Sequence, residues 1–159
     1  MNVLVVYGTQ FGPTEHVAHI IGSALQAHHR VNVIAAGDAY AVAGTGVDLL
    51  IVGAPTQVGG HRLLVRSFLD HLKRRGFTGV PAAAFDTHIF DTHIDAASQG
   101  TGSAAMAIGR RLSSAGCPVV AAPTSFLIAG MTGPMVEGED ARAACWAQGV
   151  ADSLTMAAA

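Results

Sequence analysis

A continuous apolar run, followed at once by a loop rich in glycine and hydroxyl residues, opens the chain. Residues 3–6 read Val-Leu-Val-Val, and such a run is typical of a strand buried on both faces. The run stops at Gly8, and Pro13 suits the first position of a helix, because its missing N–H would have no intrahelical partner there. Ligands of open α/β sheets bind beyond the carboxyl ends of the strands, where a helix N-terminus offers N–H groups to an anion. The opening therefore predicts either a phosphate-binding loop or an ordinary strand-to-helix turn.

The alternation of strand and helix patterns continues to the end of the chain. Five strands alternating with four helices predict a three-layer α/β fold, in which a parallel sheet with right-handed crossovers has helices on both faces. The expected strand order is 2-1-3-4-5, in a single domain over residues 1–159. The later strands are expected at 31–36, 48–53, 80–85 and 118–128, the last one broken at Pro123 and therefore near an edge. Lys73, Arg74 and Arg75 are expected to close the second helix, and Glu137, Glu139 and Asp140 to lie in the first turn of the last.

Composition narrows the class of protein. The formal net charge of −2 argues against a nucleic-acid binder and gives little field for steering a charged partner. No apolar run approaches the ~20 residues that span a bilayer, and no basic segment precedes the first strand to mark a signal peptide. The two cysteines, Cys117 and Cys145, lie far apart and are expected to be buried thiols of a reduced, cytoplasmic protein.

Two groups of histidines raise the question of a metal. His16 and His19 are three residues apart on the first helix, so they are either a metal-binding pair or solvated surface residues. The tetrapeptide Asp-Thr-His-Ile occurs at 86–89 and again at 91–94. This segment is either a set of metal ligands or a long loop at the active edge with a local duplication. We expect no metal at either place.

Two ligand classes of this architecture are excluded by the loops. A dinucleotide site needs G-x-G-x-x-G after the first strand, but Gly8 and Gly12 are four residues apart. A phospho-receiver needs an aspartate where the third strand ends, and that place holds Gly-Ala-Pro at 53–55. A mononucleotide phosphate held by a hydroxyl-rich loop remains.

At this point the chain resembles the flavodoxin family. The segment Tyr-Gly-Thr-Gln-Phe-Gly-Pro-Thr-Glu at 7–15 is similar to the loop that surrounds the FMN phosphate in that family, and Gly-Ala-Pro-Thr at 53–56 is similar to the start of its second flavin loop. Further segments resemble the short flavodoxin-like domains of actinobacteria, so the resemblance covers nearly the whole chain. These segments are 85–87, 102–105, 125–126, 133–134 and 137–139.

The resemblance implies an FMN site built by three loops and no catalytic side chain. It places the phosphate at 8–14 and the isoalloxazine ring between 56–61 and 86–90. The candidate cofactor-binding residues are Thr9, Gln10, Phe11, Gly12, Pro13, Thr14, Pro55, Thr56, Gln57, Val58, His61, Asp86, Thr87, His88 and Phe90.

The chain departs from the family pattern at both parts of this site. Phe11 stands where the family usually has a threonine, and Pro13 stands where it has an asparagine, which also removes a backbone N–H. Each lost hydrogen bond to a charged oxygen costs about 1.5–3 kcal/mol, so reduced FMN affinity is expected. No Trp, Tyr or Phe occurs in 56–62, which leaves His61 to stack on the ring, with His88 or Phe90 on its other face.

Two functions of different classes follow. The first is an FMN-dependent redox protein, either an electron carrier with a redox partner protein or a small flavin-dependent reductase, in which the flavin does the chemistry. The small net charge counts against the carrier, because dedicated flavodoxins are strongly acidic, and it permits a homodimer. The second is a flavodoxin-fold protein that has lost tight FMN binding and acts as a binding or interaction module.

Overall fold

The protein folds around a five-stranded, fully parallel sheet of strand order β2-β1-β3-β4-β5, which confirms the predicted order. The computed structural model describes residues 1–9, 11–56, 61–90 and 103–159. The strands are β1 (Asn2–Tyr7), β2 (Arg30–Ala35), β3 (Leu49–Pro55), β4 (Ala82–Ile89) and β5 (Thr124–Ile128). The helices are α1 (Pro13–Gln26), α2 (His61–Asp70), α3 (Ala104–Ser114) and α4 (Glu139–Ala158), with 3-10 turns η1 (Ala39–Ala41) and η2 (Lys73–Arg75).

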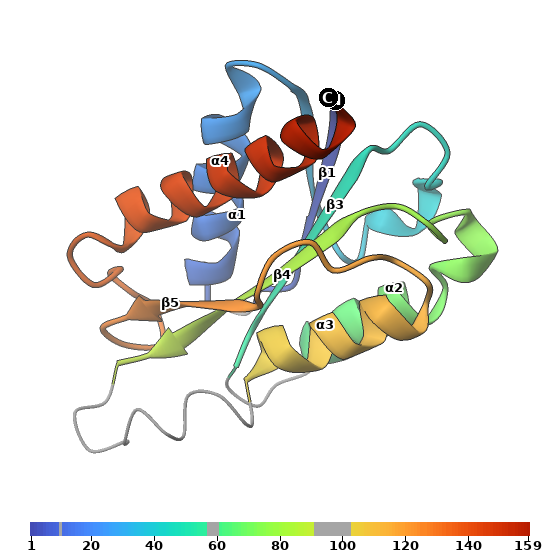
Figure 1. Ribbon diagram of the computed structural model, residues 1–159. Coiled ribbons are helices and arrows are strands. Elements are labelled where there is room, and N and C mark those ends of the chain that lie inside the picture. The colour runs from blue at the N-terminus through green and yellow to red at the C-terminus, as the bar shows by residue number, and fades with distance from the viewer. Residues whose placement is uncertain (10, 57–60, 91–102) are drawn as a thin grey trace.

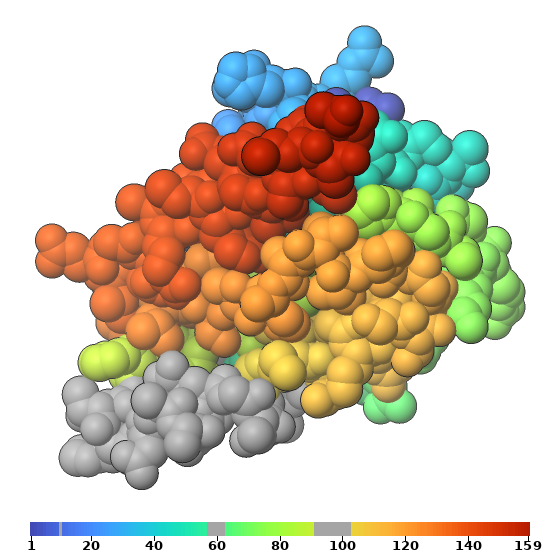
Figure 2. Space-filling view, in the orientation of Figure 1, coloured from blue at the N-terminus to red at the C-terminus, as the bar shows by residue number. Residues whose placement is uncertain are grey.

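Helices cover both faces of the sheet, so the molecule has the three expected layers. Figure 1 shows α1 and α4 on one face and α2 and α3 on the other. In Figure 2 the segment that leads from α3 into β5 lies between α3 and α4 on the visible face. Successive residues of β1 enter opposite cores, since strand side chains alternate: Val3 and Val5 pack with α1 and α4, whereas Leu4 and Val6 pack with α2 and α3.

β4 runs further than its apolar pattern predicts. The prediction of a strand at 80–85 followed by a loop from residue 86 is wrong, because Asp86, Thr87 and His88 belong to the strand. Their backbones pair with β5 in the register Asp86 to Ser125 and Thr87 to Phe126. Polar residues stay in a strand here because the neighbouring strand satisfies their backbone groups. The extension carries the Asp86 and Thr87 side chains into the carboxyl edge as buried groups.

Two helix ends also differ from the prediction. α2 ends at Asp70, and Lys73, Arg74 and Arg75 form the separate turn η2 before Gly76, whose φ of 79° is left-handed. α4 begins at Glu139, so Glu137 lies outside its first turn.

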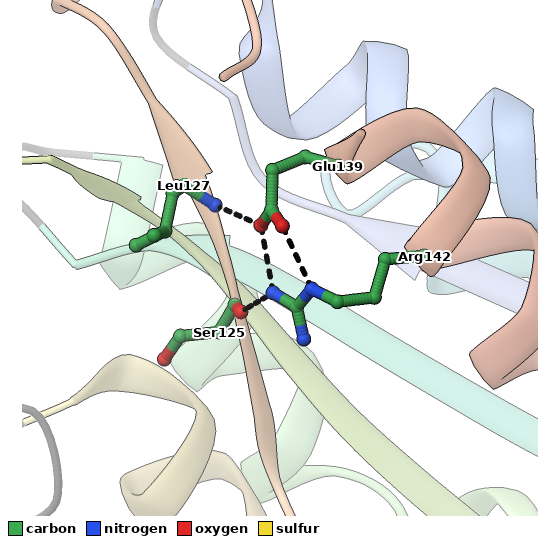
Figure 3. A network of polar contacts seen from close by, with 4 residues as sticks. All are labelled: Ser125, Leu127, Glu139 and Arg142. Carbon is green, nitrogen blue, oxygen red and sulfur yellow. Dashed lines mark hydrogen bonds and ion pairs between the residues drawn. The ribbon is translucent and has the colours of Figure 1, made fainter. Parts of the chain in front are cut away.

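The N-terminus of α4 is tied to β5 by one charged side-chain pair. Glu139 is 8% exposed, and its carboxylate accepts hydrogen bonds from the Leu127 backbone N–H at 2.7 Å and from the Arg142 Nε and Nη2 at 2.8 and 2.7 Å. Arg142 also donates to the Ser125 carbonyl, and its guanidinium lies 4.7 Å from the centre of the Phe126 ring. Figure 3 shows the carboxylate between the strand and the guanidinium.

The two cysteines are in different environments. Cys117 is 1% exposed, its Sγ–H donates to the Phe77 carbonyl at 3.3 Å, and burial raises the pKa of its thiol. Cys145 is exposed on α4, so the prediction that both thiols are buried is wrong for Cys145. The helical period puts Cys145 on the outer side of α4, next to the buried positions Ala143 and Ala147.

Candidate functional site

The loop between β1 and α1 has the geometry that its glycines and proline predict. The Gly8 N–H donates to the Gly53 carbonyl of β3 at 2.9 Å, which fixes the start of the loop to the sheet. Gly12 caps α1 with a φ of 103°, a left-handed conformation that favours glycine, and Pro13 is the first helical residue. The predicted site residue Gln10 lies outside the described residues.

Within the described residues, the first turn of α1 keeps hydrogen-bond donors without an acceptor. The Gly12 N–H donates to the Thr9 Oγ1 at 3.0 Å, and Pro13 has no N–H. The Thr14 and Glu15 amides have no acceptor among the described residues, and α1 has no side-chain cap. Such uncapped amides at the carboxyl edge of a sheet are the donors that bind a phosphate.

A buried hydroxyl pair lies under this turn. The Thr14 Oγ1 of α1 and the Thr87 Oγ1 of β4 are 2.7 Å apart, and each residue is 1% exposed. They line a small cavity of about 20 Å³ together with six other residues, none of which has a charged side chain. The lining residues are Thr9, Phe11, Pro13, Thr14, Pro55, Thr87, Ile128 and Met131. The structure thus brings six of the predicted site residues to one place.

Ile128 and Met131 are cavity residues that the sequence analysis missed. They lie at the end of β5 and just after it, and the carboxyl end of every parallel strand reaches the same edge. Because β5 was predicted to end at residue 128, this rule could have placed both residues at the site. Met131 and Phe11 are 52% and 46% exposed, so they form the apolar outer rim of the cavity.

The N-terminus of α3 contrasts with that of α1, because side chains take its first-turn amides. The Ala104 N–H donates to the Thr56 Oγ1 at 3.2 Å, and the Ala105 N–H donates to the Asp86 Oδ2 at 2.8 Å. Ser103 caps the helix by accepting from the Met106 N–H at 3.2 Å. The predicted site residues Thr56 and Asp86 therefore hold α3 to the sheet. Within the described residues, the Asp86 Oδ1 is buried without a hydrogen-bond partner.

The expected ring site is described only in part. His88 is half-buried near the end of β4, and Phe90 follows that strand with 48% of its surface exposed. Gln57 and Val58 lie outside the described residues, as does the side chain of His61. The second copy of the Asp-Thr-His-Ile repeat, at 91–94, also lies outside them.

Glu15 places a carboxylate in the first turn of α1, and its contacts hold it to one side. The Tyr7 hydroxyl donates to the Glu15 Oε1 at 3.0 Å, and the same oxygen lies 3.8 Å from the His19 Nε2. Burial, followed by this hydrogen bond, raises the pKa of Tyr7. Glu15 does not line the cavity, so an anion there would be bound by neutral donors.

His16 and His19 are exposed surface residues, and the His16 Nε2 pairs with the Asp140 carboxylate at 3.1 Å. Across residues 1–9, 11–56, 61–90 and 103–159, no group of three or more His, Cys, Asp or Glu residues could hold a metal ion. In the same part of the chain, no helix is both long and apolar enough to cross a membrane.

Several solved structures that are similar to this chain are flavodoxins. A flavodoxin from the domain Archaea matches with a TM-score of 0.74 and 20% identity, over 98% of this chain and 99% of that chain. Oxidised Flavodoxin 2 from Bacillus cereus matches with a TM-score of 0.71 and 20% identity, over 96% and 99%. Rubredoxin oxygen:oxidoreductase from the anaerobe Desulfovibrio gigas matches with a TM-score of 0.69 and 15% identity, over 98% of this chain but only 36% of that chain.

These identities are too low to carry function, and the likeness concerns the fold. No protein-family model matches the chain, and no curated protein sequence is similar to it. The narrower resemblance to actinobacterial-type domains stays a prediction. The strand order, the layers and the near-complete coverage agree, so the chain is a flavodoxin-like domain in its fold.

Proposed function

We propose that this protein binds FMN and acts as a flavodoxin-like redox protein, with the flavin phosphate at the N-terminus of α1. The observation that carries the proposal is the set of uncapped Thr14 and Glu15 amides above a small cavity lined by threonine hydroxyls. This arrangement lies at the carboxyl edge of the sheet, where α/β proteins bind ligands. A mononucleotide phosphate needs N–H and O–H donors, and these residues supply both.

The side chains present fit the phosphate end of FMN. The hydroxyls of Thr9, Thr14 and Thr87 would bind the phosphate together with the Thr14 and Glu15 amides, and Pro55 would form the wall beside it. When bound, the flavin supplies the electron-transfer chemistry. The chain's own residues bind and orient it, and the half-buried His88 and the exposed Phe90 are the described candidates to cover the ring.

Between an electron carrier and a small flavin-dependent reductase, the charge favours the reductase. A formal net charge of −2 gives weak electrostatic steering toward a basic protein partner. A cytoplasmic location and a homodimer belong to this proposal and rest on composition and charge. A redox partner protein belongs only to its electron-carrier form.

Titration of the apo-protein with FMN, followed by flavin fluorescence, tests the proposal, with riboflavin as the matched ligand that lacks the phosphate. Saturable binding of FMN at micromolar concentration or tighter, with much weaker binding of riboflavin, is expected. No FMN binding up to about 1 mM would overturn the proposal, because about 4 kcal/mol of binding free energy would then be an upper limit.

A second candidate function keeps the fold without the flavin, and three features of the loop favour it. Phe11 contributes no hydroxyl, Pro13 contributes no N–H, and the Gly12 N–H is already bonded to Thr9. The protein would then act as a binding or interaction module for another anion or for a protein. The same titration separates the two functions.

A further inference from the structure

We propose that Thr87 is a phosphate-binding residue of this site, and that the Thr14–Thr87 hydroxyl pair replaces the hydroxyl that is missing at Phe11. This inference rests on the proposed function and names a donor that lies on β4, outside the loop where phosphate ligands were expected to be concentrated. From the sequence alone, Thr87 was expected only among the residues near the flavin ring.

The hydroxyl pair has more hydrogens than its own contact uses. Each threonine hydroxyl has one hydrogen to donate and can accept as well. The 2.7 Å contact between the Thr14 Oγ1 and the Thr87 Oγ1 uses one of their two hydrogens, whichever residue donates. Neither hydroxyl has another partner among the described residues, so within that part of the chain one hydrogen of the pair has no acceptor. A buried hydroxyl without an acceptor is costly, and this pair is almost completely buried.

A small cavity lies next to the hydroxyl pair. Thr9, Thr14 and Thr87 line a cavity of about 20 Å³, which is room for one atom the size of a water oxygen. Thr9 accepts from the Gly12 N–H, so it also keeps its own hydrogen to donate. Two hydroxyl hydrogens are therefore available around a space of the size of one phosphoryl oxygen, and no cation lies among its lining residues.

Thr87 contacts both loops of the proposed site. Its side chain bonds to Thr14 of the first loop and helix, and its carbonyl accepts from the Thr56 N–H of the second loop at 3.0 Å. Thr87 thus fixes both loops to β4. An oxygen bound by the pair would be held against the sheet, which lowers the cost of ordering the site.

The experiment compares Thr87→Val, which keeps the shape but loses the hydroxyl, with Thr87→Ser, which keeps the hydroxyl. The Kd for FMN and for riboflavin is measured for each variant by flavin fluorescence. We expect Thr87→Val to raise the Kd for FMN by about ten- to a hundredfold and to leave the Kd for riboflavin nearly unchanged. Thr87→Ser should bind FMN within a fewfold of the wild type.

Thr78→Val is the matched control. Its hydroxyl donates to the Ala115 carbonyl at 3.3 Å, next to Gly79, before β4 begins. It also loses one side-chain hydrogen bond but should leave both Kd values unchanged. Circular dichroism verifies that every variant is folded before titration.

The outcomes separate this inference from the proposed function. If the wild type and Thr87→Val bind FMN equally well, the phosphate role of Thr87 is wrong and the FMN function stands. The same conclusion holds if Thr87→Val and Thr87→Ser both bind FMN and riboflavin more weakly to the same extent. If the wild type does not bind FMN, the proposed function fails. In that case the unfolding temperatures of the wild type and of Thr87→Val are measured with and without inorganic phosphate. If phosphate raises the unfolding temperature of the wild type but not that of Thr87→Val, the inference is supported. If phosphate changes both unfolding temperatures equally, the inference is overturned.

Discussion

Phe11 and Pro13 set the number of donors that the phosphate loop can offer. Phe11 is 46% exposed at the rim of the cavity, and the Pro13 nitrogen carries no hydrogen. The double variant Phe11→Thr with Pro13→Asn restores a hydroxyl, an amide side chain and a backbone N–H. We expect its Kd for FMN to fall by about tenfold or more, because each hydrogen bond to a charged oxygen contributes about 1.5–3 kcal/mol.

Pro13→Ala is the matched control for that double variant, because it restores only the backbone N–H and should give part of the gain. The measurement is the titration of each apo-protein with FMN, followed by flavin fluorescence. A double variant that binds no tighter than the wild type would mean that this loop does not contact the phosphate.

Gly53 is required where β3 passes the aromatic cluster of the sheet. A Cβ at this position would lie 2.1 Å from the Phe85 Cζ, and Phe85 is fully buried against Phe126 and Trp146. Because Phe85 is fully buried and must shift within a packed core, Gly53→Ala should lower the free energy of unfolding by about 1–3 kcal/mol. Urea unfolding measures it.

Gly149→Ala provides the opposite control, since Gly149 is an exposed position of α4 with no atom within 4 Å of the added Cβ. It should raise the free energy of unfolding by about 0.5–1 kcal/mol. Equal stability of the Gly53→Ala variant and the wild type would show that the contact with Phe85 is relieved at little cost.

At the scale of elements, α4 depends on the pair between Glu139 and Arg142. Glu139→Gln keeps an acceptor for the Leu127 N–H but removes the negative charge that Arg142 contacts twice. Since the Arg142 side chain is 45% exposed and can regain water, we expect a loss of about 1.5–3 kcal/mol in the free energy of unfolding rather than the full cost of a buried charge.

Asp70→Asn is the matched control, because Asp70 pairs with Arg111 at 2.6 Å but its side chain is 51% exposed, against 11% for Glu139. Asp70→Asn should lower the free energy of unfolding by less than about 1 kcal/mol. An equal loss in the two variants would mean that burial of Glu139 adds nothing to its pair.

The pair between Glu139 and Arg142 also makes the free energy of unfolding depend on pH. The hydrogen bond from Arg142 lowers the pKa of Glu139 below its ordinary value of 4.5. A carboxyl whose pKa is lower in the folded than in the unfolded state stabilises the protein above the unfolded value, and the gain is lost as the pH falls through the folded value. The stability difference between the wild type and Glu139→Gln should therefore narrow below pH 4.5.

At the scale of the whole molecule, the arrangement of layers was predictable and the polar contacts were not. Continuous apolar strands alternating with amphipathic helices allow few topologies, so the strand order follows from pattern alone. The length of β4 did not follow, because Asp86 is a poor strand former and breaks the apolar pattern, yet Asp86 and Thr87 stay in the strand through pairing with β5. The Thr14–Thr87 contact joins residues 73 positions apart, and no local spacing encodes it.

The two cysteines differ in their accessibility to thiol reagents. In the native protein Cys145 is open to solvent and Cys117 is enclosed, so a thiol reagent meets one reactive group per chain, and a second becomes reachable only when the core opens. The stoichiometry of alkylation thus counts folded against unfolded molecules. A dye placed on Cys145 marks α4 at a single point, with no engineered attachment site required.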